Sequence, residues 1–118
     1  MSDKKSPITT HVLDTAQGHP AENVPVVLEI RGNNGEWKKL ADGKTDKDGR
    51  IMNLLGANHR LEIGTYLLTF VTGEYFGRQK LRSFYPAVTI LFIVAEPDQH
   101  YHVPLLISPF GYSTYRGS

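Results

Sequence analysis

The sequence contains no cysteine among its 118 residues. Disulfide bonds, thiolate metal sites and cysteine nucleophiles are therefore excluded, and cysteine usage gives no information about the redox compartment. An excess of charge of one sign is also missing, since 13 Lys and Arg residues face 12 Asp and Glu residues, for a formal net charge of +1. This balance gives no indication of binding to nucleic acid or to an anionic membrane surface.

Long hydrophobic runs are missing too. A membrane-spanning helix needs about 20 apolar residues, whereas the longest apolar segment, Val88–Ala95, has only the length of a strand. The polar and charged residues 1–7 contain no apolar run typical of a signal peptide. The final Arg116-Gly117-Ser118 differs from the Ser-Lys-Leu peroxisomal signal. We therefore predict no membrane segment and a cytoplasmic location.

What the chain does contain is a series of short β-like runs separated by turn residues, with no long helical period. Strands are predicted at Ile8–Asp14, Val24–Arg31, Trp37–Thr45, Arg50–Leu55, Gly64–Thr72, Val88–Val94 and His100–Ser108. One short helix is predicted at Gly73–Leu81. About eight short strands and at most one helix predict an all-β fold, an antiparallel β-sandwich. Residues 8–118 would form this single domain, after a disordered tail over residues 1–7.

The segment Val88–Val94 is apolar on both faces of the predicted strand. Alternate residues put Val88 and Ile90 on one face, and Leu91 and Ile93 on the other. Two interpretations are open for the second face. Either another part of the same chain covers it, or it forms an interface between subunits.

A pair of histidines lies in the last predicted strand. Alternation places Tyr101 and Val103 towards the core, so His100 and His102 share the opposite, polar face. Three roles remain open for the pair: hydrogen bonding to backbone or water, general acid–base catalysis, or ligation of a metal. No third metal ligand is evident nearby. His11 lies inside the first predicted strand, while the remaining two histidines fall in turn-like, solvated stretches.

Several ordered motifs carry a resemblance that spans residues 10–118. They are Thr10-His11-Val12-Leu13-Asp14, Gly43-Lys44-Thr45, Asp48-Gly49-Arg50, Phe84-Tyr85-Pro86, His100-Tyr101-His102-Val103-Pro104-Leu105-Leu106 and Tyr112-Ser113-Thr114-Tyr115-Arg116-Gly117-Ser118. In these motifs the chain resembles the transthyretin-related family, and more narrowly its 5-hydroxyisourate hydrolase branch. The thyroid-hormone carriers of the same fold differ from that branch at the positions of His11, Arg50 and His102. This chain has the hydrolase residue at each of the three.

The resemblance implies a transthyretin-like sandwich that assembles as a homotetramer, a dimer of dimers. It implies hydrolysis of 5-hydroxyisourate to 2-oxo-4-hydroxy-4-carboxy-5-ureidoimidazoline, without a cofactor or metal and without nucleic-acid or membrane partners. The implied catalytic residues are His11, Arg50 and His102, in a cleft where dimers meet. The implied substrate-binding residues are His11, Arg50, His100, Tyr115, Arg116, Gly117 and Ser118.

The residue types suggest a division of roles within this set. His102 would act as the base that activates water, and His11 would orient the water or donate a proton. Arg50 would hold substrate oxygens through its planar guanidinium group. Two alternatives remain: a carrier that binds a small aromatic ligand in the cleft between dimers, and a sandwich that serves only as an interaction domain.

Overall fold

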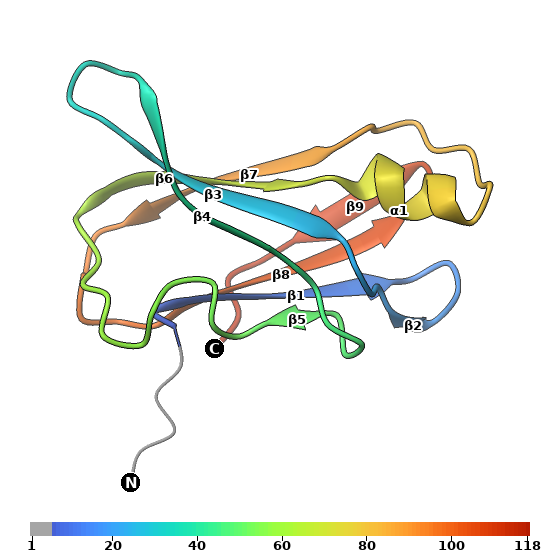
Figure 1. The fold of residues 1–118 in the computed structure, drawn as a ribbon, viewed down its shortest axis with the longest axis horizontal. Coiled ribbons are helices and arrows are strands. Elements are labelled where there is room, and N and C mark those ends of the chain that lie inside the picture. Colours follow the sequence, from blue (N-terminus) through green and yellow to red (C-terminus); the bar gives the residue numbers. More distant parts are fainter. Residues whose placement is uncertain (1–5) are drawn as a thin grey trace, which may run out of the picture.

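The computed structural model describes residues 6–118, which fold into two packed β-sheets and one short helix (Figure 1). The strands and the helix are β1 Ile8–Asp14, β2 His19–Pro20, β3 Pro25–Arg31, β4 Trp37–Lys44, β5 Arg50–Ile51, β6 Gly64–Phe70, α1 Thr72–Arg78, β7 Val88–Val94, β8 Tyr101–Ser108 and β9 Gly111–Thr114. The predicted all-β sandwich with one helix is confirmed. The structure adds two short strands, β2 and β9, that the sequence did not reveal, and it shortens the predicted fourth strand to two residues.

The strand order explains how distant parts of the sequence meet. One sheet has the order β2-β1-β8-β9, with β5 also paired to β1, and the other has the order β4-β3-β6-β7. Every strand pair among the described residues is antiparallel except β1 with β8, which run parallel. This parallel pair is the one exception, among the described strand pairs, to the antiparallel sandwich predicted from the sequence. It places the first and the eighth strand side by side in the middle of one sheet.

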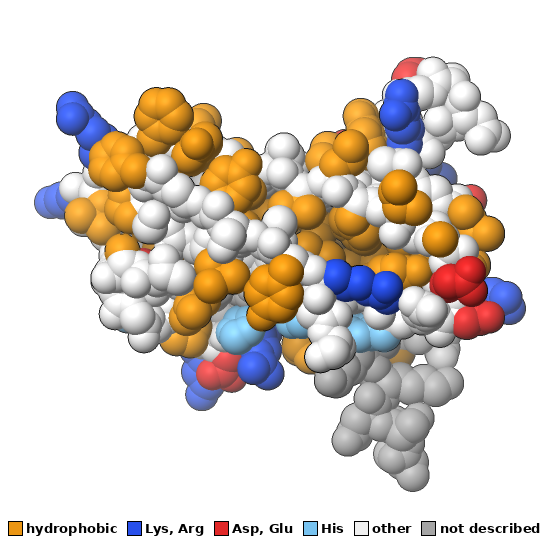
Figure 2. Space-filling view, turned by 180° about the vertical axis from the view of Figure 1, so that it is seen from behind, with side chains coloured by type: hydrophobic (Ala, Val, Ile, Leu, Met, Phe, Trp, Pro, Cys, Tyr) orange, Lys and Arg blue, Asp and Glu red, His pale blue; other side chains and the backbone are white. Residues whose placement is uncertain are grey.

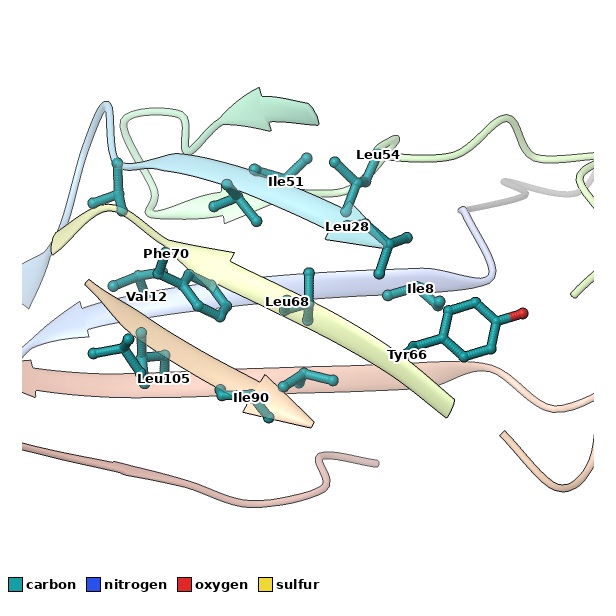
Figure 3. Close-up of a cluster of buried hydrophobic side chains, with 14 of the residues drawn as sticks. Ile8, Val12, Leu28, Ile51, Leu54, Tyr66, Leu68, Phe70, Ile90 and Leu105 are labelled. Atoms are coloured by element: carbon teal, nitrogen blue, oxygen red, sulfur yellow. The ribbon is translucent and has the colours of Figure 1, made fainter. Parts of the chain in front are cut away.

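The core lies between the two sheets, where alternate residues of facing strands interdigitate (Figure 3). Val12 and Leu105 come from one sheet, Leu28 and Leu68 come from the other, and all four are fully buried. Removing this much apolar surface from water is the main driving force for the fold. Because strand residues alternate between faces, filling the inner face fixes which residues β1 and β8 present on the outer face.

The described part of the chain includes Ser6 and Pro7, the last two residues of the predicted tail. Residues 1–5 of the predicted tail lie outside the described residues. Ser6, which the prediction also placed in the tail, is buried, and its hydroxyl accepts a hydrogen bond of 3.0 Å from the Leu55 N–H. Over residues 6–118, the fold contains no helix of the length and apolar character that a membrane crossing requires.

The outer face of β7 answers one of the questions raised by the sequence. Leu91 and Ile93 are 60% and 70% exposed, although Val88 and Ile90 on the inner face of the same strand are buried. No described segment of the chain covers this outer face, so the first of the two interpretations is wrong for residues 6–118. Figure 2 views the molecule from behind relative to Figure 1, and it shows exposed hydrophobic side chains gathered over the upper part of this face.

Candidate active site

The outer face of the sheet around β1 brings together residues from four segments. His11 on β1 is paired in register with Arg50 on β5, and Thr9 is paired with His102 on β8. Residues that pair directly across neighbouring strands point to the same face of a sheet. An isolated bridge then joins His102 to Gly117 near the C-terminal end of the chain. Histidine side chains lie in the lower part of the face shown in Figure 2, beside blue Lys and Arg side chains.

The turn before β5 holds Arg50 at the edge of this face. The Asp46 carboxylate accepts hydrogen bonds from the N–H groups of Asp48 at 2.8 Å and of Arg50 at 3.0 Å. Gly49 has a φ of 75°, and a Cβ at this position would lie 2.4 Å from the Val12 carbonyl oxygen. Only glycine adopts this conformation without strain and also leaves room for the carbonyl. The Asp48-Gly49-Arg50 motif is therefore a turn that delivers Arg50 next to β1.

A hollow of about 180 Å³ lies among these residues, lined by Thr9, Arg50, Met52, His100, His102 and Ser118. The Arg50 and His100 side chains are exposed, whereas His102 is half-buried. His102 is thus held by its surroundings but still reaches the hollow. Four of the residues that the sequence analysis singled out, Arg50, His100, His102 and Ser118, meet at this one place.

His102 on β8 and His100, the residue just before β8, share one partner. The Oγ1 atom of Thr9 lies 2.7 Å from Nδ1 of His102 and 3.1 Å from Nε2 of His100. The two imidazole rings are stacked, with centroids 6.5 Å apart and planes inclined by 16°. Both rings therefore lie on the same side of the sheet, next to Thr9, as the predicted alternation of residues 100–108 indicated.

His11 lies beside Arg50 but does not line the hollow. Partial burial lowers the pKa of His11 below its ordinary value, and the positive charge of Arg50 lowers it further. A ring hydrogen bond to the Asp48 backbone and the nearby Asp46 carboxylate act in the opposite direction but do not cancel these effects. A histidine whose pKa is lowered from about 6.5 is mostly neutral at pH 7.

The C-terminal segment divides into residues with different surroundings. The Gly117 N–H donates a hydrogen bond of 2.8 Å to the His102 carbonyl oxygen, and Ser118 lines the hollow. The Arg116 guanidinium bonds the Gln99 side chain at 2.9 Å and lies 4.4 Å from the centre of the Tyr101 ring. Tyr115 is 61% exposed, and it lines a neighbouring hollow of about 250 Å³ together with Arg116 and His102. The structure thus separates the predicted binding residues Tyr115 and Arg116 from the hollow that Arg50 lines.

Sequence reasoning missed two residues of the hollow, Thr9 and Met52. Alternation along β1 puts Thr9 on the same face as His11, but its place beside His102 depends on the parallel pairing of β1 with β8. Nothing in the sequence pointed to Met52, which follows the short β5. Within residues 6–118, no three histidine, aspartate or glutamate side chains are grouped closely enough to hold a metal ion.

The lowered pKa of His11 predicts a pH-dependent term in stability. In the unfolded chain this histidine takes up a proton near pH 6.5, whereas in the folded chain it does so only at lower pH. Stability from this source is therefore complete above pH 6.5 and is lost as the pH falls through the lower pKa of the folded state. We expect wild-type protein to lose more unfolding free energy than His11→Gln between pH 7.5 and pH 5.5, measured by urea titration. An equal loss in both proteins would contradict the assignment.

The fold and this outer face together define a class: a transthyretin-like β-sandwich with arginine and histidine side chains around a surface hollow. A model of the HIUase/Transthyretin family matches residues 8–117. The 5-hydroxyisourate hydrolase of Salmonella typhimurium is 46% identical over 111 residues, which cover 94% of this chain and 80% of that protein. The chain belongs to the HIUase/Transthyretin family.

Two solved structures show how widely the fold is shared. The 5-hydroxyisourate hydrolase of Klebsiella pneumoniae has a TM-score of 0.83 at 40% identity, covering 94% of this chain and 97% of that one. Sea bream transthyretin in complex with thyroxine has a TM-score of 0.88 at 32% identity, covering 95% of both chains. The family and the transthyretin-like fold predicted from the sequence are confirmed. Backbone similarity alone does not separate a hydrolase from a carrier.

Proposed function

We propose that the protein hydrolyses 5-hydroxyisourate to 2-oxo-4-hydroxy-4-carboxy-5-ureidoimidazoline. The observation that carries the proposal is that Arg50 and His102, far apart in the sequence, line one hollow of about 180 Å³. An arginine and a histidine around one small hollow suit a reaction that needs an anion-stabilising group and a base. The enzyme class is supported by relatives that are themselves 5-hydroxyisourate hydrolases, 46% and 42% identical to this chain.

The names of substrate and product define the chemistry required. A ring amide is opened by water, so that a new carboxyl group and a ureido group appear. The step needs a base for the water, donors for the developing oxyanion and a proton for the departing nitrogen. His102 would take the proton from water through Nε2, since its Nδ1 is 2.7 Å from the Thr9 hydroxyl. The proton would then pass to the nitrogen as the C–N bond breaks.

Arg50 and His11 would act on the oxygen atoms. The guanidinium group offers several N–H donors in one plane together with a positive charge. It would stabilise the negative charge that develops on the carbonyl oxygen as water attacks. His11 stays mostly neutral at pH 7 because burial and Arg50 lower its pKa, so its N–H can orient the attacking water.

The C-terminal segment would complete the hollow. Ser118 lines it and can offer its hydroxyl to the substrate. The Gly117 N–H is hydrogen bonded to the His102 carbonyl oxygen, so the C-terminal segment is held next to the His102 ring. Direct contact of Tyr115 and Arg116 with the substrate stays a prediction, because both line the neighbouring hollow.

We also propose that the protein assembles as a homotetramer, a dimer of dimers, in which copies meet near this face. The exposed Leu91 and Ile93 on β7 support this assembly. β7 and β9 are the outer strands of their respective sheets, so each leaves backbone groups available for pairing with another chain. The cytoplasmic location stays a prediction.

Charging the outer face of β7 should break the assembly. We expect the double variant Leu91→Lys, Ile93→Lys to remain folded but to lose tetramer mass in light scattering, because lysine is costly to bury at an apolar interface. Trp37→Lys is the matched control, since β4 is the opposite edge strand of the same sheet and Trp37 is 38% exposed. A double variant with unchanged mass would rule out β7 as an interface.

The decisive assay for the proposed function uses 5-hydroxyisourate made freshly by urate oxidase. We expect the protein to accelerate the decay of its ultraviolet absorbance well beyond the spontaneous rate. The carrier alternative predicts the opposite behaviour: saturable binding of an aromatic ligand such as thyroxine, with the decay rate of 5-hydroxyisourate unchanged. An interaction domain would show neither turnover nor binding.

A further inference from the structure

Thr9 is a buried residue beside the hollow, and the proposed function has so far given this residue no role. Its side chain is 0% exposed, although it lies on the outer face of β1, on the same side as His11. Parallel pairing of β1 with β8 places Thr9 directly beside His102. The residue therefore lies behind the proposed base and away from bulk water.

The hydrogen bonds of Thr9 link the positions of the ring protons of His100 and His102. Its hydroxyl oxygen lies 2.7 Å from His102 Nδ1 and 3.1 Å from His100 Nε2. A hydroxyl carries one proton, so it can donate to only one of the two ring nitrogens, and while it does so it accepts a hydrogen bond from the N–H of the other ring. When Thr9 accepts from His102 Nδ1–H, it donates to His100 Nε2. When it accepts from His100 Nε2–H, it donates to His102 Nδ1.

These two arrangements leave the reactive nitrogen of His102 in opposite states. In the first, Nδ1 of neutral His102 holds the proton, so Nε2 has a lone pair and can act as a base. In the second, Nδ1 accepts from Thr9, so Nε2 holds the proton and can act as an acid. The arrangement of the His100–Thr9 hydrogen bond therefore decides which form of His102 faces the substrate.

The geometry around the pair is fixed rather than adaptable. Threonine is branched at Cβ, which restricts its side-chain rotation in a strand. On the other side of the base, a Cβ on Gly117 would lie 2.6 Å from His102 Cδ2, so the ring fills the space that any larger residue would need. His100 stacks on His102 with a ring inclination of 16°. The imidazole is thus held between Thr9, Gly117 and the neighbouring ring.

We propose that Thr9 is a positioning residue that joins His100 and His102 into one proton-sharing unit. This inference rests on the proposed function, in which His102 is the base. Because Thr9 touches the histidines, it acts on the reaction through His102 rather than on the substrate.

The proton balance of the unit is closed. Before reaction, His100 holds its proton on Nδ1 and His102 holds its own on Nδ1. In the reaction, Nε2 of His102 takes a proton from the attacking water. The proton on Nδ1 of His102 then passes to Oγ1 of Thr9, and the hydroxyl proton of Thr9 passes to Nε2 of His100. The positive charge then resides on His100, and His102 presents Nε2–H. When His102 donates its Nε2 proton to the departing nitrogen, the other protons move back from His100 to Thr9 and from Thr9 to His102. The three groups then have their starting protonation states.

Two variants of Thr9 test the proposal. Thr9→Val keeps the shape of the side chain but removes the hydroxyl, whereas Thr9→Ser keeps the hydroxyl and removes the methyl group. We expect Thr9→Val to lower kcat about 10- to 100-fold with KM changed less than about 2-fold, and Thr9→Ser to stay within about 3-fold of wild type. For wild type, we expect a plot of kcat against the deuterium fraction of the solvent to be curved, because several protons move in the same step. For Thr9→Val, we expect this plot to be linear. Equal loss in both variants, or an unchanged kcat in Thr9→Val, would overturn the proposal.

A second measurement needs no substrate. Nitrogen-15 NMR of the imidazole rings distinguishes Nδ1–H from Nε2–H, and we expect Thr9→Val to change the balance of these forms in both His100 and His102. Identical spectra in wild type and Thr9→Val would refute the coupling even if the protein were an active hydrolase. Conversely, a changed spectrum with no turnover in the wild type would contradict only the proposed function.

His100→Phe interrupts the same unit from its other end, and it keeps the proposal testable if Thr9→Val fails to fold. We expect its kcat to fall by a factor similar to that of Thr9→Val. The double variant Thr9→Val, His100→Phe should be no slower than either single variant, because the losses caused by substituting residues that act as a unit do not add. Multiplied losses in the double variant, or a His100→Phe rate equal to wild type, would overturn the proposal.

Discussion

Replacing His102 with asparagine is expected to lower kcat for 5-hydroxyisourate by about 100- to 10,000-fold, the range attributed to a general acid–base group. Asparagine places a polar atom near the position of Nδ1, so a hydrogen bond to Thr9 remains possible. It has no atom at the position of Nε2, the nitrogen that would face the water. The variant therefore removes the base while disturbing its surroundings little.

The controls for this variant separate catalysis from folding. The far-ultraviolet circular dichroism spectrum and the assembly mass should match those of wild type, because His102 is half-buried on the outer face and not part of the core. Turnover by His102→Asn near the wild-type rate would show that another group is the base. Rates are measured from the absorbance decay after subtraction of the spontaneous reaction.

Replacing Arg50 with methionine is expected to lower kcat/KM by about 100- to 1,000-fold, the loss typical of removing an oxyanion donor. Methionine keeps most of the aliphatic stem and removes the charge and the donors. Arg50→Lys is the matched control, because lysine keeps the positive charge but lacks the planar guanidinium group. Its kcat/KM should therefore lie between those of wild type and Arg50→Met.

The Arg50 variant has a second consequence that does not depend on activity. The charge of Arg50 contributes to the lowered pKa of His11, so that pKa should rise in Arg50→Met, although burial continues to hold it down. Arg50→Lys should leave it nearly unchanged. Proton NMR titration of the His11 ring measures both effects. A His11 pKa that is the same in Arg50→Met and wild type would show that the two residues do not interact across β1 and β5.

The strand pattern of the sequence predicted the sandwich because burial and alternation are local properties. β1 and β7 have the predicted bounds, and Tyr101 and Val103 face the core as expected. The parallel pairing of β1 with β8 was not predictable in the same way. Turn residues fix which neighbouring strands form hairpins, but no turn connects strands that are more than 80 residues apart in the sequence. The two-residue β2 was too short for any periodic signal.

The site could be predicted only in part. Alternation along the last predicted strand singled out His100 and His102, and the resemblance added Arg50 and Ser118; the structure brings all four to one hollow. Thr9 was missed because its place beside His102 follows from the parallel pairing. The outer residues of β7 were identified correctly as unusual, because apolar residues on both faces of an edge strand have few explanations.

The comparison of two relatives shows why the side chains decide the function. Sea bream transthyretin matches the backbone with a TM-score of 0.88, which is higher than the 0.83 of the Klebsiella hydrolase. A shared fold places strands but does not specify the chemistry on their outer face. The proposal of hydrolysis therefore depends on the arrangement of Arg50 and His102, together with the identity of the relatives.

The most direct test of this account is to run the reaction in water enriched in oxygen-18 and to analyse the product within seconds by mass spectrometry. We predict that the protein forms the ring-opened ureidoimidazoline faster than the spontaneous reaction, with one oxygen-18 atom in its new carboxyl group. His102→Asn should form it no faster than buffer. Product that appears at the spontaneous rate, or accelerated decay that yields a product without oxygen-18, would contradict the account.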